Sequence, residues 1–264
     1  VAAAERKVAL GGEFGGRGQD LFERRHQRAG RYQNGRAARP PPPYPRTMPE
    51  PTLLHLESAD ATPLCGLLWE APAGAPGVVV IPGYASRKEN HREFGGMLSA
   101  LGMAVLALDV RGHGESAGEL DGGALDDVHS AIAVLAARGH ERIGLRGSSM
   151  GGMLALLAAA GDRRVHAVVS IAAARPDRFA DRLGQEWARR LDVVGACARE
   201  GVARGFWHAT GDDTVPWGHT FLLAGASSAP VRLRVAMGGG HETLQHDPAI
   251  MAETAEFLQV HLRA

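Results

Sequence analysis

Arg-Ile-Gly-Leu-Arg-Gly-Ser-Ser-Met-Gly-Gly occupies positions 142–152 of this 264-residue chain and decides its predicted fold. Its first residues, Arg142–Leu145, predict a buried strand, and the apolar stretch Met150–Ala160 predicts a helix. The segment between them matches G-x-S-x-G, which in a strand–turn–helix context places a serine nucleophile on a sharp, strained turn. We therefore predict a nucleophile at Ser149, above the carboxyl end of an α/β sheet, where such folds bind their ligands.

Two other interpretations of this turn exist. Glycine is common in the chain, with 35 residues, so the segment can also be read as a purely structural turn. Ser148 is the second hydroxyl of the turn, but it lacks a glycine two residues before and two residues after it. The strand before the turn and the helix after it favour Ser149.

From Pro51 onward the chain alternates between short strand-like runs and longer helical stretches. Two early runs, Leu53–Leu56 and Leu64–Trp69, alternate as antiparallel edge strands do. Continuously apolar runs, typical of parallel strands buried on both faces, are Val78–Ile81, Ala104–Leu108, Ile143–Leu145, Ala167–Ile171, Phe206–Ala209 and Val231–Val235. Helices are expected at His91–Leu101, Ala124–Arg138, Met150–Ala160, Asp177–Arg199, His219–Leu223 and Pro248–Leu262. This alternation predicts one α/β domain over residues 48–264, with a doubly wound, mostly parallel sheet and helices on both faces.

His241 is the candidate general base. A serine hydroxyl needs an adjacent base that a third group orients, and in sites of this kind the chain order is serine, acid, histidine. His241 lies in the glycine-rich segment 238–242 after a predicted strand, and glycine lets such a loop turn sharply. The other candidates after the nucleophile are His166 and His208, interpreted as structural, His246 and His261, interpreted as solvated, and His219.

Asp212 is the candidate acid. It follows the apolar run Phe206–Ala209, in the segment Gly-Asp-Asp-Thr-Val-Pro at positions 211–216. A carboxylate there can orient the imidazole and stabilise the imidazolium that forms during acyl transfer. Asp212 has the expected position relative to Val215, and Asp213 is the alternative. Both can also be read as caps of the following helix.

Acyl transfer also needs hydrogen-bond donors for the developing oxyanion. We expect them to be the amide of Met150, directly after the nucleophile, and the amide of Tyr84 in the loop 82–86. The ring of Tyr84 is a candidate wall of the substrate pocket or a cover of the core. Trp217, beside the candidate acid, is open to the same two interpretations.

With these segments assembled, the chain resembles the α/β-hydrolase superfamily, most closely its small esterase, monoacylglycerol-lipase-like and dienelactone-hydrolase-like members. The resemblance covers roughly residues 52–262, and the segments that carry it are Pro82–Tyr84, Asp109–Ser116, Gly147–Gly151, Asp212–Pro216 and Gly240-His241. Asp109–Ser116 is similar to the superfamily's D-x-R-G-H-G-x-S segment, which implies a structural role for His113. The chain departs from the usual pattern at Pro82, where the oxyanion loop normally has histidine. Position 149 is serine, whereas dienelactone hydrolases use cysteine.

The segment between two late strands bears on the substrate. Only 34 residues separate Ala167–Ile171 from Phe206–Ala209, and they hold one amphipathic stretch with Trp187. A large lid does not fit this length, which predicts a small or absent cap and favours small or short-to-medium acyl esters. Arg87 and Lys88 follow the oxyanion loop. They are candidates for contact with a substrate carboxylate, but a solvated loop is the favoured interpretation.

Composition restricts the class of protein further. Residues 48–264 hold 19 basic and 25 acidic residues, and this excess of acid does not suit a nucleic-acid-binding face. Cys65 and Cys197 form neither a disulfide framework nor a zinc pattern, and we interpret them as apolar fillers or free thiols. No apolar run has the length of a membrane span or of a signal-peptide core. We expect a soluble, cytoplasmic enzyme; the sequence does not indicate its oligomeric state.

Residues 1–47 differ in kind from the rest. They hold ten basic and four acidic residues, several glycine pairs and a proline run at 40–43. Such a segment has too few large apolar residues to offset the entropy of ordering, so we expect it to be disordered. It can be read as a flexible basic tail, as a polyproline II ligand, or as sequence upstream of the true start at Met48, which is the favoured interpretation.

The sequence thus predicts a carboxylesterase-like serine hydrolase that acts on a small-molecule ester through an acyl-enzyme. No metal or organic cofactor is expected, because the base activates the serine. A peptidase, thioesterase or acyltransferase would use the same residues, and the fold does not decide among them. Two alternatives from other classes are a non-catalytic ligand-binding module and a scaffold recruited through residues 1–47.

Overall fold

A single eight-stranded sheet organises the protein, in the order β1-β2-β4-β3-β5-β6-β7-β8. The computed structural model describes residues 48–228 and 231–263, and the expectations for residues 1–47 lie outside this range. The strands are β1 (Thr52–Glu57), β2 (Pro63–Trp69), β3 (Gly77–Ile81), β4 (Ala104–Asp109), β5 (Ile143–Ser148), β6 (Val165–Ile171), β7 (Ala203–Ala209) and β8 (Val231–Ala236). β2 is antiparallel to β1 and β4, and the pairs from β4 to β8 are parallel. The predicted doubly wound, mostly parallel sheet is confirmed.

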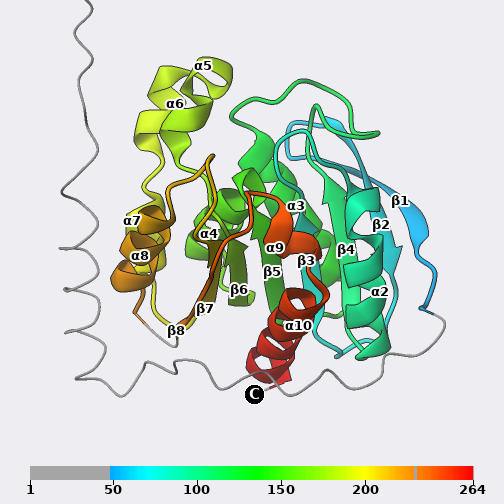
Figure 1. Cartoon of the computed structure of the whole chain (residues 1–264). Coiled ribbons are helices and arrows are strands. Elements are labelled where there is room, and N and C mark those ends of the chain that lie inside the picture. The colour runs from blue at the N-terminus through cyan, green and yellow to red at the C-terminus, as the bar shows by residue number, and fades with distance from the viewer. Residues whose placement is uncertain (1–47, 229–230, 264) are drawn as a thin grey trace, which may run out of the picture.

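Helices cover both faces of this sheet (Figure 1). They are η1 (Lys88–His91), α2 (Arg92–Ala100), α3 (Ala124–Ala137), α4 (Met150–Gly161), η2 (Pro176–Phe179), α5 (Ala180–Leu183), α6 (Gln185–Arg190), α7 (Val193–Cys197), α8 (Trp217–Ala226), α9 (Thr243–His246) and α10 (Pro248–Arg263). In Figure 1, α2 and α10 lie in front of the sheet, with α3 and α4 behind it. Because all strands from β3 to β8 run in one direction, the loops after them gather at one edge of the sheet.

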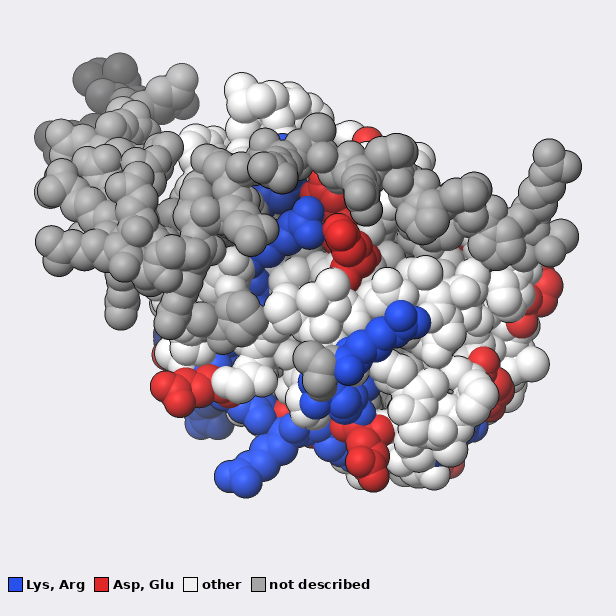
Figure 2. Space-filling model, turned by 90° about the horizontal axis from the view of Figure 1, so that it is seen from below, with Lys and Arg blue, Asp and Glu red and all other residues white. Residues whose placement is uncertain are grey.

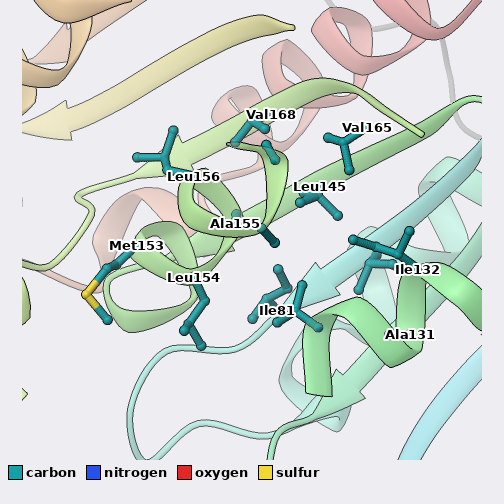
Figure 3. Close-up of a cluster of buried hydrophobic side chains, with 14 of the residues drawn as sticks. Ile81, Ala131, Ile132, Leu145, Met153, Leu154, Ala155, Leu156, Val165 and Val168 are labelled. Atoms are coloured by element: carbon teal, nitrogen blue, oxygen red, sulfur yellow. The ribbon is translucent and has the colours of Figure 1, made fainter. Parts of the chain in front are cut away.

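The sheet separates two apolar cores. On the side of α3 and α4, side chains such as Leu145, Leu154 and Val168 are fully buried and pack between sheet and helices (Figure 3). The other core lies under α2 and α10 and contains Trp69, Val80 and Leu258 among its buried residues. The continuously apolar central strands supply side chains to both cores, as buried parallel strands do. These cores hold the loops at the carboxyl edge in place.

Three predictions about individual elements are wrong. β8 is an edge strand rather than a strand buried on both faces, because Arg232 and Arg234 alternate with its apolar residues. β2 lies inside the sheet, not at its edge. The predicted helix 177–199 is divided into η2, α5, α6 and α7, since Gly184 has φ +88° and Asp192 begins a new helix by accepting a hydrogen bond from the Gly195 amide.

The short helices α5 and α6 form a small cap, which stands above the sheet in Figure 1. Trp187 on α6 donates a hydrogen bond from its indole Nε1 to the carbonyl oxygen of Gly122 at 3.2 Å. This contact joins the cap to the loop before α3. The prediction of a small cap is confirmed, and it leaves only short segments above the carboxyl edge of the sheet.

Charges of both signs lie next to each other on the face seen in Figure 2. Ion pairs also join the edge strand β8 to α10: Arg232 pairs with Glu256, and Arg234 lies 3.8 Å from Glu253. Cys65 and Cys197 are buried free thiols, as predicted. None of the helices in the described ranges has the length and apolar character needed to cross a membrane.

Candidate active site

Ser149 forms the turn between β5 and α4, and its backbone is strained. Its φ of 51° and ψ of −116° are unusual for a residue with a side chain. The flanking glycines are sterically required. A Cβ on Gly147 would lie 2.2 Å from the carbonyl carbon of Gly151, and a Cβ on Gly151 would lie 2.2 Å from the carbonyl oxygen of Ile81. The G-x-S-x-G pattern therefore reflects a turn that larger residues cannot form.

Asp212 lies in the loop after β7, with its side chain fully buried. Its Oδ1 accepts hydrogen bonds from the amides of Thr214 at 2.9 Å and Val215 at 2.8 Å. Its Oδ2 accepts one from Nδ1 of His241 at 2.7 Å. Asp213, the alternative acid, is exposed, and its carboxylate accepts from the hydroxyl of Thr214. The geometry therefore pairs Asp212, and not Asp213, with the candidate base.

The charge state of Asp212 follows from these contacts. Burial opposes ionisation and is the largest single influence on the carboxyl group. The hydrogen bonds from Val215, His241 and Thr214 outweigh burial, and together they hold the pKa of Asp212 below its ordinary value. The side chain is thus a carboxylate at neutral pH, and it stabilises positive charge on His241.

His241 lies in the loop after β8, which turns at Gly238 and Gly239, with φ of +72° and +71°. This loop is hydrogen-bonded to the loop that carries Asp212. The Gly211 amide donates to the carbonyl oxygen of Gly238, and the Gly238 amide donates to the Thr210 hydroxyl at 2.8 Å. The His241 side chain is 16% exposed, so its ring is open at the surface of the site. Across the described residues, no hydrogen bond joins its ring to the Ser149 hydroxyl.

Arg146, Ser148 and Gln245 form a buried set of hydrogen bonds, here called the Gln245 clamp, that joins the segment after His241 to β5. Arg146, on β5, donates from its guanidinium to the backbone carbonyl oxygen of Gln245 at 2.8 Å. Ser148 donates from its hydroxyl to Oε1 of Gln245 at 2.5 Å. Sequence analysis missed Gln245 and Arg146, although an arginine inside the apolar strand 143–148 is a signal that it needs a specific partner. The clamp sets the positions of two loops whose side chains have to meet.

The loop after β3 lies beside Ser149. A Cβ built on Gly83 would be 3.6 Å from the Cβ of Ser149, so the backbone of this loop passes close to the serine. Met150 is the first residue of α4, and its amide therefore has no carbonyl partner within the helix. The ring of Tyr84 is 42% exposed and makes edge contacts with His113, at 5.7 Å between ring centroids, and with Phe179, at 6.1 Å. The ring of Tyr84 therefore lies against two aromatic rings and is still partly open to solvent.

The interpretation of Arg87 and Lys88 as a solvated loop is wrong for Lys88. Its side chain is fully buried, and its ammonium group lies 2.7 Å from Asp109 and 2.5 Å from Glu115. Burial opposes its charge, but hydrogen bonds to these carboxylates raise the pKa of Lys88 above its ordinary value. The Lys88 amide also donates to Asp109 at 2.7 Å. Lys88 anchors the loop after β3, whereas the Arg87 side chain is exposed.

The remaining histidines have separate surroundings. His113 is buried, with Nδ1 3.1 Å from the carbonyl oxygen of Arg111. His166 is similarly placed near Arg164 O, and His261 packs on the ring of Phe257. His246 is exposed and stacks against the buried ring of His91.

Trp217, the other candidate pocket residue, begins α8 and packs against Phe221. Within the described ranges, no three His, Cys, Asp or Glu side chains are arranged to hold a metal ion.

Comparisons with known proteins agree with this architecture. The family model for the α/β-hydrolase fold matches residues 76–194. An α/β hydrolase from Penicillium sp. sh18 is 17% identical and superposes with a TM-score of 0.69 over 81% of this chain and 99% of its own. Est1E from Butyrivibrio proteoclasticus, solved with ferulic acid bound, is 18% identical, with a TM-score of 0.70 over 80% of this chain and 100% of its own. An esterase from Pyrococcus furiosus is 19% identical, with a TM-score of 0.65 over 81% and 92%. No curated protein matches this chain significantly in sequence.

The sheet order, the turn after β5 and the family match together define the fold. This chain has the α/β-hydrolase fold. The match begins just before β3 and ends within α7, and so includes the loop after β3 and the turn with Ser149.

Proposed function

We propose that this protein is a serine hydrolase that cleaves carboxylic esters through an acyl-enzyme. The observation that carries the proposal is the strained turn at Ser149, on the same edge of the sheet as the hydrogen-bonded pair Asp212–His241. A strained backbone at a partly buried serine is typical of functional sites. A base oriented by a buried carboxylate is what a serine needs to become a nucleophile.

Each residue then has a defined role. Ser149 Oγ attacks the acyl carbon while His241 Nε2 takes its proton, and the same nitrogen returns that proton to the departing alcohol. The ionised Asp212 holds the Nδ1–H of the ring and stabilises the imidazolium. The amides of Met150 and Tyr84 donate to the oxyanion, which is commonly the largest contribution to such catalysis. Water then attacks the acyl-enzyme by the reverse proton path.

The size of the substrate follows from the cap. The cap consists of the short helices α5 and α6. A cap of this size favours small or short-to-medium acyl groups. Tyr84 follows Gly83, whose backbone passes close to Ser149, and its partly exposed ring contacts Phe179, which makes it a candidate apolar surface for the acyl chain. Trp217 is a second candidate for this surface. Structural neighbours that include an esterase support ester chemistry.

The test is hydrolysis of p-nitrophenyl acetate, butyrate and octanoate by the wild type and by Ser149→Ala. We expect kcat to fall by about 10⁴-fold or more in the variant, as when triad serines are removed from other hydrolases. Ser130→Ala, on α3, is the matched control and is expected to retain wild-type rates. Equal rates for Ser149→Ala and the wild type would reject Ser149 as nucleophile. Equal rates would favour the alternative that the protein is a non-catalytic ligand-binding module.

A parallel assay decides among acyl substrates on the same residues. Thioester and anilide analogues of butyrate, at equal concentration, should be cleaved with a lower kcat/KM than the oxygen ester. A higher kcat/KM for the thioester or the anilide would make the enzyme a thioesterase or an amide hydrolase instead. A cytoplasmic location stays a prediction from the sequence.

A further inference from the structure

Two imidazole rings approach the same oxygen of Asp212. His241 Nδ1 donates to Oδ2 at 2.7 Å, and Nε2 of His208 lies 3.2 Å from that oxygen. His208 comes from β7, four residues before Asp212, and its side chain is fully buried. The second carboxylate oxygen is already occupied by the amides of Thr214 and Val215. The hydrogen bond of His208 Nε2 is to the carbonyl oxygen of Val215, and this nitrogen also lies within 3.2 Å of Oδ2, so its N–H dipole faces the carboxylate at short range.

The neighbours of His208 decide where its proton lies. Nε2 is 3.0 Å from the carbonyl oxygen of Val215 and 3.2 Å from the Asp212 carboxylate. Both groups only accept hydrogen bonds, so Nε2 must carry the hydrogen. Nδ1 lies 2.6 Å from the hydroxyl of Thr220, a buried residue of α8. Burial lowers the pKa of His208, so the ring is neutral at pH 7 and its Nδ1 accepts from Thr220.

Neighbouring loops and helix α8 place titratable groups around His208. Asp212 faces it from the loop after β7, His241 from the loop after β8, and His219 from α8. Burial, together with the charge of Arg175, lowers the pKa of His219 to about 4, so this ring is neutral above about pH 5. Above that pH, the fixed charge next to His208 is the carboxylate of Asp212.

We propose that His208 is a positioning residue: its fixed, neutral Nε2–H, 3.2 Å from Oδ2, places partial positive charge beside the Asp212 carboxylate, favours its position next to His241 and offsets part of the negative charge that Oδ2 presents to that ring. This inference rests on the proposed function, in which Asp212 orients the base. His208 acts through Asp212 and does not touch the substrate. Thr220 fixes the tautomer, because a hydroxyl that donates to Nδ1 keeps the hydrogen on Nε2.

Removal of the Nε2–H of His208 should shift the pH profile of kcat/KM in a defined direction. Without it, Oδ2 carries more negative charge and stabilises the protonated form of His241 more strongly. The acidic limb of the pH profile of kcat/KM then moves to higher pH. We expect a shift of about 0.5 to 1 pH unit in His208→Leu, with a lower kcat because the carboxylate is less well oriented. His208→Gln, which can still donate, is expected to shift the limb less.

The Thr220 variants test the same inference with a smaller change in the core. Thr220→Val has nearly the same shape but lacks the hydroxyl, so the donor strength of His208 falls and the limb moves up by a smaller amount. Thr220→Ser keeps the hydroxyl and is expected to restore the wild-type profile. His166→Leu, a histidine replacement on β6, is the control and should leave the profile unchanged. The Thr220 pair keeps the test valid if His208→Leu does not fold.

The measurements are the pH profile of p-nitrophenyl butyrate hydrolysis and the downfield proton resonance of the His241–Asp212 hydrogen bond. Loss of the resonance in Asp212→Asn assigns it, and because it needs no turnover it tests the inference even if ester hydrolysis is not observed. We expect the resonance to move in His208→Leu and Thr220→Val, but not in Thr220→Ser. An unchanged resonance and acidic limb in both variants, with only a lower melting temperature, would overturn the proposal and make His208 a packing residue.

Discussion

Nδ1 of His241 donates a 2.7 Å hydrogen bond to Oδ2 of Asp212, while the neighbouring Asp213 is exposed and bonds only to the Thr214 hydroxyl among the described residues. Asp212→Asn should therefore lower kcat by about 10⁴-fold, because an amide neither fixes the correct tautomer of the imidazole nor stabilises its charged form. Asp213→Asn is the matched control, with rates within a factor of about two of wild type. The check is kcat for p-nitrophenyl butyrate, and a larger loss in Asp213→Asn would move the acid by one residue.

The Gln245 clamp predicts coupling between two residues that lie 97 positions apart in the sequence. Ser148→Ala and Gln245→Ala should each lower the melting temperature and kcat, since the His241 loop is then less firmly held. In the double variant the effects should not add, and a coupling energy of about 1 kcal/mol is expected for a buried pair in contact. Urea unfolding of the four proteins measures it. Additive losses would mean that the contact does not stabilise the loop.

The turn at Ser149 predicts that glycine is required at position 151. Gly151→Ala places a methyl group 2.2 Å from the carbonyl oxygen of Ile81, so the backbone has to move and activity should be lost together with several degrees of melting temperature. Gly218→Ala is the control, because nothing lies within 4 Å of its Cβ position in α8. It should stabilise the protein by up to about 1 kcal/mol through helix propensity. A fully active Gly151→Ala protein would contradict the geometry of the turn.

His91 predicts a specific pH dependence of stability. It is buried, both ring nitrogens lack a hydrogen-bond partner among the described residues, and burial, with the charge of Arg146, lowers its pKa from 6.5 to about 3. As the pH falls from 6.5 toward 3, the unfolded chain binds a proton that the folded chain does not, so the free energy of unfolding decreases. Between pH 7 and 5 this one ring costs about 2 kcal/mol.

His91→Phe removes this dependence and loses no hydrogen bond to a described residue. Urea unfolding at pH 7 and pH 5 should show a smaller loss of stability in the variant than in the wild type, by about the same 2 kcal/mol. The other histidines titrate in both proteins and cancel in the difference. The same loss in both proteins would show that His91 does not control acid stability.

Tyr84 predicts a change in substrate affinity without a change in chemistry. The residue is 42% exposed and follows Gly83, which lies close to Ser149, and its backbone amide is the proposed oxyanion donor. Tyr84→Ala keeps the amide and removes the ring, so KM for p-nitrophenyl butyrate should rise about tenfold with kcat little changed. Tyr84→Phe keeps the ring and should resemble the wild type. A fall in kcat alone would place the ring in catalysis rather than in binding.

The fold could be predicted because its signals are local. The apolar runs of the central strands and the turn at 147–151 each lie within a few consecutive residues. The burial of β8 was mispredicted because its position at the edge depends on strand order, which a single run does not reveal. The helix 177–199 was mispredicted since its apolar period continues across Gly184, where the backbone turns left-handed.

The candidate site was predictable only in part. Chain order and glycine content pointed to Asp212 and His241, which the structure brings together. The supporting residues came from the structure, because their partners are distant in sequence: Arg146 bonds to a residue 99 positions away, and Lys88 to one 21 positions away. His208 looked structural in the sequence, and only the approach of its ring to Asp212 indicates a role in the site.

The central claim is that Ser149 forms a covalent bond to the acyl group of the substrate. Treatment with diethyl p-nitrophenyl phosphate, followed by mass analysis of the proteolytic peptides, tests it most directly. We predict complete inactivation with one equivalent of p-nitrophenol released, and a single diethylphosphoryl group on Ser149. Full ester hydrolysis with Ser149 unmodified, or an adduct on another residue, would contradict the assignment of the nucleophile.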